Sequence, residues 1–228
     1  MKKNLLLLHG ALGASSQFKD LAKILRPYFD IYTFDFEGHG KNNSDNEFSI
    51  GLFTINLVDF IAKNKLEDIN IFGYSMGGYV ALNYVSKHSN TVEKIITLGT
   101  KYKWNPESSK QEAKMLNIDL LREKALNFVS ELKNLHGTPK WEKVVNKTRE
   151  MILSLGDNPV LEDGDLSKIK CKTQVCLGEL DKMVSLEESL QIVNNIEGAD
   201  FLHLNQTKHP IDKVDVSYLS EIIKEFIL

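Results

Sequence analysis

Short apolar runs alternate with stretches of helical period along most of this 228-residue chain, and the alternation restricts the fold strongly. A strand buried on both faces is continuously apolar, whereas an amphipathic helix repeats its apolar residues at i, i+3, i+4 and i+7. The runs that fit buried strands are 5–8, 31–34, Ile69–Tyr74, 94–98, 173–177 and 199–204. Helical patterns follow at 18–25, 53–61, 77–87 and 216–228. The sequence therefore predicts an α/β fold with a mostly parallel sheet flanked by helices.

The stretch 101–168 interrupts this alternation with consecutive helical patterns. Residues 125–135 and 141–152 each form one apolar stripe, and both tryptophans, Trp104 and Trp141, lie in this stretch. A short pair of helices cannot bury such stripes alone, so they must cover the main domain or a pocket in it. We expect one domain over 1–228, with 101–168 inserted into it as a helical lid.

Composition and charge exclude several classes of function. The formal net charge of −3 gives no basic face for nucleic acid or an anionic membrane, so a small molecule is the expected partner. The N-terminal apolar run 5–8 is too short for a signal peptide, and no apolar stretch approaches 18 residues, which predicts a cytoplasmic location. Cys171 and Cys176 would point to opposite faces of one strand, so we expect free, buried thiols. The expected assembly is a monomer or a weak homodimer.

The sequence from Gly73 to Gly78 contains a G-x-S-x-G pattern centred on Ser75, where a predicted strand gives way to a helix. Small residues at Gly73 and Gly77 allow the strand and the helix to approach closely, and the tight turn presents the serine hydroxyl above the sheet. The free N–H groups of a helix that begins at Met76 favour negative charge at this position. Ser75 is therefore the candidate nucleophile.

A serine hydroxyl needs a general base to attack at neutral pH. His209 lies in a polar loop between the last predicted strand and the last helix, at the same sheet edge as Ser75. We expect His209 to be the base, with His39 and His203 as the alternatives.

The base in turn needs an acid that orients it. Asp181 follows the predicted strand 173–177 and precedes His209, which gives the order nucleophile, acid, histidine of the α/β-hydrolase arrangement. Glu179 is the alternative. The other nearby acids lie at the exit of the insertion and are expected to be solvated: Asp157, Asp163 and Asp165.

Taken together, four motifs resemble those of the α/β-hydrolase superfamily, and the resemblance covers nearly the whole chain apart from the insertion. These motifs are the His-Gly loop at 8–11, the D-x-x-G-H-G segment at 35–40, the serine turn at 73–78, and the acid segment 178–181 with His209. The resemblance implies a three-layer α/β-hydrolase sandwich with a helical lid. It also implies an oxyanion hole formed by the N–H groups of Ala11 and Met76, with Leu12 as the alternative second donor, and a structural role for His39.

By this resemblance the chain is expected to be a serine esterase that cleaves a carboxylic ester or thioester of a small molecule through an acyl-enzyme. Such hydrolysis needs no metal and no organic cofactor, and the sequence contains no ligand cluster or phosphate-binding glycine pattern. The residues expected to contact the substrate are Leu12, Tyr79, Trp104 and Trp141.

The same fold supports other reactions, so alternatives stay open. The serine turn is similar to that of MenH-type synthases, which usually carry an arginine after the glycine pair to bind a substrate carboxylate. This chain has Tyr79 there, although Lys101, Lys103 or Arg122 could supply the cation from the lid. A C–C bond hydrolase with the same triad is a further alternative, and a ligand-binding protein without catalysis is another.

Overall fold

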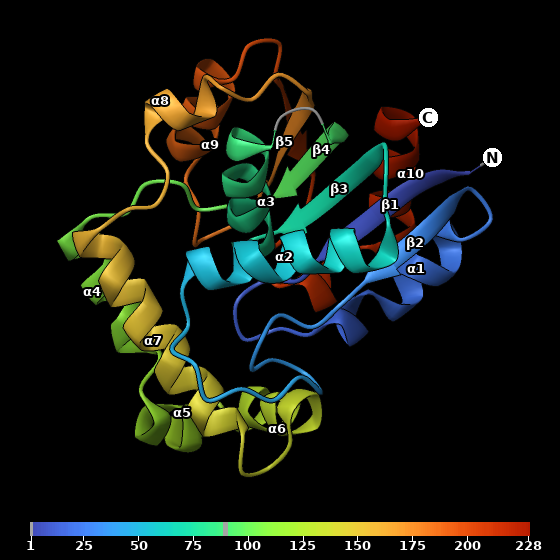
Figure 1. The fold of residues 1–228 in the computed structure, drawn as a ribbon. Helices are drawn as coiled ribbons and strands as arrows, with labels where there is room; N and C mark the ends of the chain where they lie inside the picture. The colour runs from blue at the N-terminus through green and yellow to red at the C-terminus, as the bar shows by residue number, and fades with distance from the viewer. Residues whose placement is uncertain (1, 89–90) are drawn as a thin grey trace.

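The computed structural model describes residues 2–88 and 91–228, and one six-stranded sheet forms its centre (Figure 1). The strands are β1 (Lys3–Leu8), β2 (Phe29–Thr33), β3 (Ile69–Tyr74), β4 (Val92–Leu98), β5 (Lys172–Gly178) and β6 (Asp200–Leu204). Their order in the sheet is β2-β1-β3-β4-β5-β6, and every neighbouring pair is parallel. All six strands predicted from the sequence are confirmed.

Helices cover both faces of this sheet. In β1, Leu5 and Leu7 join the apolar cluster shared with α1 (Lys19–Leu25) and α10 (Val216–Ile227). Leu6 and Leu8 join the opposite cluster, because successive side chains of a strand point to opposite faces. The helices that pack on this face include α2 (Ile50–Asn64), α3 (Met76–Lys87), α8 (Asp163–Leu166) and α9 (Leu186–Asn195), and the same cluster continues into helices of the insertion. Burial on both faces explains why β1 is continuously apolar over residues 5–8.

Four helices between β4 and β5 make up most of the predicted insertion: α4 (Pro106–Met115), α5 (Ile118–Lys124), α6 (Leu126–His136) and α7 (Trp141–Asp157). They lie together at one side of the sheet, away from the α1 and α10 layer (Figure 1). The stripes at 125–135 and 141–152 predicted α6 and α7. Sequence periodicity did not separate α4 and α5, which begin after Asn105 and Asn117; both side chains accept hydrogen bonds from first-turn N–H groups.

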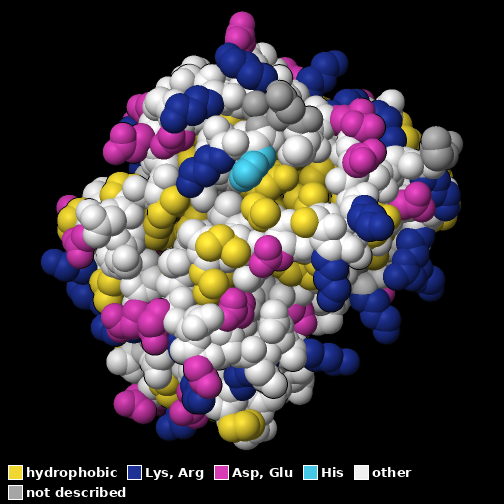
Figure 2. All heavy atoms as spheres, in the orientation of Figure 1, with side chains coloured by type: hydrophobic (Ala, Val, Ile, Leu, Met, Phe, Trp, Pro, Cys, Tyr) yellow, Lys and Arg dark blue, Asp and Glu magenta, His cyan; other side chains and the backbone are white. Residues whose placement is uncertain are grey.

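The surface agrees with the balanced composition. On the face shown in Figure 2, lysine and arginine side chains are interspersed with acidic ones, so this face carries no extended field of one sign. Among the described residues, no helix combines the length and the apolar character that crossing a membrane requires. Cys171 and Cys176 are buried free thiols, as predicted.

Candidate active site

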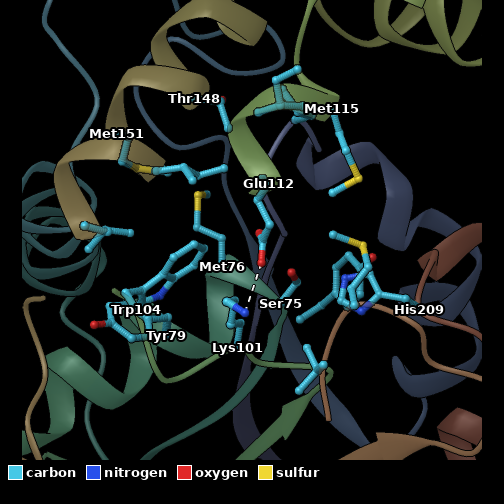
Figure 3. A pocket seen from close by; sticks show the side chains of 18 of the residues that line it. Ser75, Met76, Tyr79, Lys101, Trp104, Glu112, Met115, Thr148, Met151 and His209 are labelled. Carbon is cyan, nitrogen blue, oxygen red and sulfur yellow. Dashed lines mark ion pairs between the residues drawn. The ribbon is translucent and has the colours of Figure 1, made fainter. Parts of the chain in front are cut away.

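Ser75 occupies the sharp turn between β3 and α3. Its φ of 50° and ψ of −117° place it in the positive-φ region that residues with a side chain rarely adopt. A Cβ atom at Gly77 would collide with the carbonyl oxygens of Leu8 and His9, so only glycine lets α3 come this close to β1. The Ser75 side chain caps no helical N–H group and lines a cavity instead (Figure 3). The backbone strain is typical of a serine presented for nucleophilic attack.

His209 and Asp181 form a hydrogen-bonded pair beside this turn. Nδ1 of His209 lies 2.7 Å from Oδ2 of Asp181, and the Asp181 side chain is only 1% exposed. The other carboxylate oxygen of Asp181 accepts the N–H groups of Met183 at 2.8 Å and Val184 at 3.0 Å. Burial acts to raise the pKa of Asp181, but the hydrogen bond and charge of His209 and these two N–H groups together lower it. The ionised carboxylate can only accept, so it holds the proton of His209 on Nδ1 and leaves Nε2 free.

Ser75 and His209 face the same cavity from two different loops (Figure 3). The ring of Tyr74 packs against the imidazole of His209, with their centroids 5.5 Å apart, and restricts its orientation. Within the described residues, the Ser75 hydroxyl is not hydrogen-bonded to His209. Hydrogen bonds between catalytic groups are often long in the free protein and tighten only when substrate binds.

The other candidate bases and acids lie elsewhere. His39 is completely buried without lining the cavity, and His203 is exposed on the edge strand β6. Glu179 accepts the N–H of Gln206 at 2.8 Å. Among the described residues, none of the three remaining acids pairs with His209, whose ring binds Asp181 instead: Asp157, Asp163 and Asp165. Among the sequence candidates, the structure thus brings together Ser75, His209 and Asp181.

The cavity is lined, from the loop after β1 and from the first turn of α3, by residues whose backbone N–H groups have no hydrogen-bond partner within the described chain. Met76 is the first residue of α3, so its N–H has no partner within the helix. In the part of the chain that the structure describes, the N–H groups of Ala11 and Leu12 also make no hydrogen bond. Ala11, Leu12 and Met76 all line the cavity next to Ser75, so both loop residues remain candidates for the second oxyanion donor.

His9 and Asp35 connect the loop after β1 to the loop after β2 through hydrogen bonds. Nε2 of His9 accepts the N–H of Phe36 at 3.1 Å, so its proton is on Nδ1, which donates to the carbonyl of Gly10 at 2.8 Å. Burial lowers the pKa of His9 to about 4, which keeps the ring neutral. Asp35 accepts the N–H groups of Ser15 at 2.8 Å and Lys41 at 2.9 Å. The motifs at 8–11 and 35–40 therefore connect neighbouring loops beneath the cavity.

The cavity has a volume of about 370 Å³ and extends from Ser75 between the sheet and the insertion (Figure 3). Its lining is mostly apolar and includes Leu12, Tyr79, Trp104, Met115, Met151 and Leu155. Trp141, which we expected to contact substrate, is not part of the lining. It is 1% exposed because it packs inside the insertion, where Arg122 and Lys133 lie near its ring.

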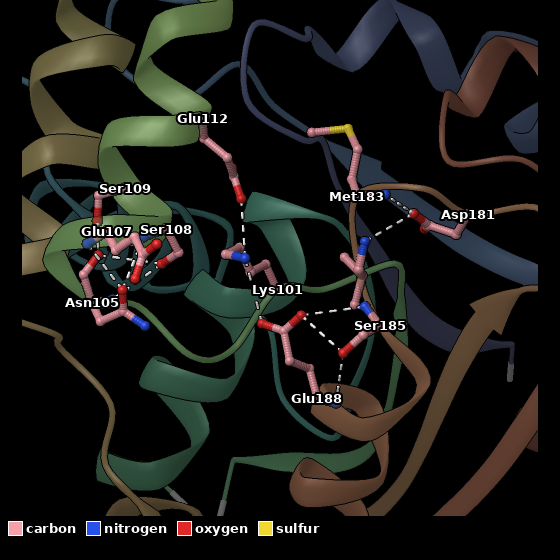
Figure 4. Close-up of polar contacts among 11 residues, drawn as sticks. Lys101, Asn105, Glu107, Ser108, Ser109, Glu112, Asp181, Met183, Ser185 and Glu188 are labelled. Atoms are coloured by element: carbon pink, nitrogen blue, oxygen red, sulfur yellow. Dashed lines mark hydrogen bonds and ion pairs between the residues drawn. The ribbon is translucent and has the colours of Figure 1, made fainter.

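One polar spot interrupts this apolar wall. Nζ of Lys101 lies 3.1 Å from Glu112 on α4 and 3.5 Å from Glu188 on α9 (Figure 4), and it also lies over the ring of Trp104. Lys101 and Glu112 both line the cavity. Burial raises the pKa of Glu112, and the charge of Lys101 opposes that rise. Two carboxylates thus neutralise Lys101, while Arg122 pairs with Glu142 away from the cavity.

Two residues of this site were not found from the sequence. Gly99 follows β4 with a φ of 59°, and a Cβ atom there would lie 3.1 Å from both Oδ2 of Asp181 and Nδ1 of His209. A glycine directly after a predicted buried strand was the available signal. Glu112 was missed because α4 was not recognised, although Asn105 followed by Pro106 is a typical helix start.

Known proteins with similar sequences share one fold and include several activities. The family model described as alpha/beta hydrolase fold matches residues 3–158. Ethanol acetyltransferase 1 of Kluyveromyces lactis is 34% identical over 86 residues, which are 37% of this chain and 23% of that protein. The sn-1-specific diacylglycerol lipase ABHD11 of Danio rerio is 29% identical over 96 residues, 41% of this chain and 30% of that protein. The matched segments thus cover less than a third of either relative.

The fold is also found in solved structures. That of MenH from S. aureus superposes with a TM-score of 0.78 at 24% identity, covering 99% of this chain and 93% of that one. At this identity the likeness establishes the shared fold alone.

Proposed function

The chain belongs to the α/β-hydrolase fold family, and on that premise we propose that it is a serine hydrolase that cleaves a carboxylic ester or thioester of a small molecule. The proposal is carried by one observation, the 2.7 Å hydrogen bond between Asp181 and His209 at the cavity that the strained Ser75 also lines. Ser75 is the nucleophile, His209 the general base and Asp181 the residue that orients His209.

The geometry supports a two-step reaction. Nε2 of His209 takes the proton of the Ser75 hydroxyl as its oxygen attacks the acyl carbonyl, and the N–H groups of Met76 and of Ala11 or Leu12 stabilise the resulting oxyanion. His209 then returns the proton to the leaving alcohol or thiol. Water, activated by the same imidazole, attacks the acyl-enzyme and releases the acid. Asp181 stays ionised throughout and stabilises the imidazolium.

The cavity wall favours substrates without a negative charge. Most of the lining is apolar, and Lys101 is already paired with Glu112 and Glu188. A substrate carboxylate would meet two like charges around this lysine, which disfavours binding. Tyr79 also occupies the position where MenH-type synthases usually carry their arginine, and its hydroxyl accepts the N–H of Leu161. These contacts support a neutral ester over the anionic substrate of such a synthase.

Transfer of the acyl group to an alcohol is the second candidate. The similarity to ethanol acetyltransferase 1 favours it, as does the apolar lining, because an apolar cavity admits a small alcohol readily. The two reactions share the acyl-enzyme and differ in the nucleophile that resolves it. Turnover of an ester in water with added ethanol separates them, since a transferase forms mainly the ethyl ester and a hydrolase mainly the free acid.

Labelling with a fluorophosphonate probe tests the common step. We expect the wild-type chain to be labelled at Ser75 and to turn over neutral p-nitrophenyl esters, with a preference for some acyl length. Ser75→Ala should remove labelling and lower turnover by about 10⁴-fold or more. Ser217→Ala, at an exposed position on α10, is the matched control and should change neither. A folded wild-type chain with no labelling and no ester turnover would overturn the proposed hydrolase activity.

A further inference from the structure

We propose that His136, at the end of α6 in the insertion, is a positioning residue for the oxyanion loop. The inference rests on the proposed function, because it assigns His136 a role in holding the loop that carries Ala11 and Leu12. His136 itself does not line the cavity, so it acts through the loop and not on the substrate.

His136 bridges two loops of the sheet domain through both ring nitrogens. Its Nδ1 accepts the backbone N–H of Gly40 at 2.9 Å, and its Nε2 lies 2.9 Å from the carbonyl oxygen of Leu12. Because Nδ1 accepts from a backbone N–H, the proton of the neutral ring must be on Nε2, which then donates to Leu12. The side chain is buried, and burial lowers its pKa, which is consistent with this neutral form.

The carbonyl that His136 binds belongs to a strained residue. Leu12 has a φ of 59°, which is unfavourable for a residue with a Cβ atom, and it lies in the turn closed by the N–H of Gly13 and the carbonyl of Gly10 at 3.1 Å. Relaxation of Leu12 to negative φ would rotate its peptide groups and turn the N–H groups of this loop away from Ser75. The hydrogen bond from His136 opposes that rotation.

A second contact joins the insertion to the loop that contains Gly40. Nζ of Lys140, four residues beyond His136, donates to the carbonyl oxygens of Gly40 at 2.6 Å and Asn42 at 3.1 Å. Lys140 and the Gly40 N–H therefore hold the end of α6 where its histidine can reach Leu12. In this way the docked insertion contributes to the geometry of the oxyanion loop as well as to the cavity wall.

Two conservative variants separate the two hydrogen bonds. The amide oxygen of Asn in His136→Asn can replace Nδ1 and keep the bond from Gly40, but it loses the donor to Leu12. The amide nitrogen of Gln in His136→Gln can replace Nε2 and keep the donor to Leu12. We expect His136→Asn to lower kcat about 10- to 100-fold with little change in KM, and His136→Gln to retain kcat within about threefold.

A transition-state analogue distinguishes positioning from general destabilisation. The inhibition constant of a trifluoromethyl ketone, whose serine adduct carries an oxyanion, should rise in His136→Asn in parallel with the fall in kcat.

A double variant tests the link to the strained residue. Replacing Leu12 by Gly removes the strain, so His136→Asn should lower kcat less in the Leu12→Gly background than in the wild type. Asn134→Ala, exposed on the same helix, is the control for stability. Equal kcat in folded His136→Asn and the wild type, or equal losses in the Asn and Gln variants, would overturn the proposal.

A measurement on the wild-type chain keeps the proposal testable if these variants do not fold. The ¹⁵N NMR spectrum of the imidazoles should show His136 with its proton on Nε2 and protected from solvent exchange. A proton on Nδ1, or a freely exchanging ring, contradicts the proposed hydrogen bond. If the wild-type chain has no reactive Ser75, the proposed function fails, and this spectrum still decides whether His136 holds the loop.

Discussion

The strand-end loops and the helical insertion line the same cavity with different kinds of groups. The loops provide Ser75, which has a strained backbone, and His209, which is hydrogen-bonded to Asp181. The insertion provides mainly apolar side chains such as those of Met115 and Met151. A thioether chain has several rotatable bonds and adapts to the shape it contacts. If the proposed hydrolase function holds, we expect the loops to determine reactivity and the insertion to determine which substrate groups fit.

Some polar residues of the insertion do not follow this division. Glu112 and its partner Lys101 bring charge into the apolar wall, and His136 hydrogen-bonds to the loop at Leu12. We therefore expect substitutions in the loops to change mainly kcat. Substitutions in the insertion should change mainly the preference among substrates. The following experiments test that separation.

Substitution of Asp181 by Asn should leave the fold intact and remove most of the activity. The amide oxygen can still accept the N–H groups of Met183 and Val184, but its NH₂ group would donate to Nδ1 of His209 and shift the proton to Nε2, the wrong position for a base. We expect kcat for an ester to fall by about 10⁴-fold. Glu179→Gln is the matched control, because within residues 2–88 and 91–228 the Glu179 carboxylate accepts hydrogen bonds from Gln206 alone. Comparable losses in both variants would mean that the acid has been misassigned.

Acid should destabilise the loops through their buried histidines. The pKa of His9 falls from 6.5 in the unfolded chain to about 4 in the folded one, so the unfolded state binds the proton more tightly. The stabilisation is complete above pH 6.5 and is lost as the pH falls toward 4, at a cost of about 3 kcal/mol from His9 alone. His39 and His136, whose pKa values burial also lowers, act in the same direction. Urea unfolding at several pH values between 7 and 4.5 measures this loss, and a free energy of unfolding that stays constant over that range contradicts it.

Replacing Glu112 by Gln should change substrate preference more than catalysis. The substitution leaves Lys101 with Glu188 as its one remaining carboxylate partner among the described residues, so the polar spot loses its excess negative charge. We expect KM for an ester with a distal carboxylate to fall about tenfold, while kcat for a neutral ester stays within about twofold. Glu107→Gln, at an exposed position of the same helix, should leave both values unchanged. A loss of kcat for the neutral ester would instead give Glu112 a part in the reaction.

The smallest effect is expected from Met115, which is 54% exposed and lines the cavity from α4. Shortening it to Ala removes part of the wall, so KM for long-chain esters should change about two- to fivefold, with little change for acetate esters. Thermal unfolding should be nearly unaffected, because the side chain is already half in solvent. The neighbouring Lys114→Ala is the control, and a uniform change across all chain lengths would place Met115 outside the acyl site.

Much of the structure around the sheet was predictable, because the sequence patterns that indicate it involve only a few neighbouring residues. Continuous apolar runs identified the strands, and the turn around Ser75 was recognisable because the close approach of α3 to the end of β1 selects glycine at Gly77. His209 follows the last strand in the sequence, and the parallel direction of the strands predicted that it lies at the same edge of the sheet as Ser75. The insertion was less predictable: Trp141 was expected at the substrate and lies inside the helices. An apolar stripe indicates that one face of a helix is buried, but it does not indicate whether another helix or a substrate covers that face.

By itself, the sequence determined the order of the six strands along the chain, the helices that flank most of them, the serine turn and the residues available for a triad. Each of these depends on steric preferences over a few neighbouring residues or on the fixed direction of a parallel strand. The tertiary structure decided which residues meet across long separations. His136 reaches Leu12 over 124 residues of sequence, and Lys101 lies between acids from two different helices. Such contacts depend on how whole elements dock, and docking is set by the packing of many side chains at once.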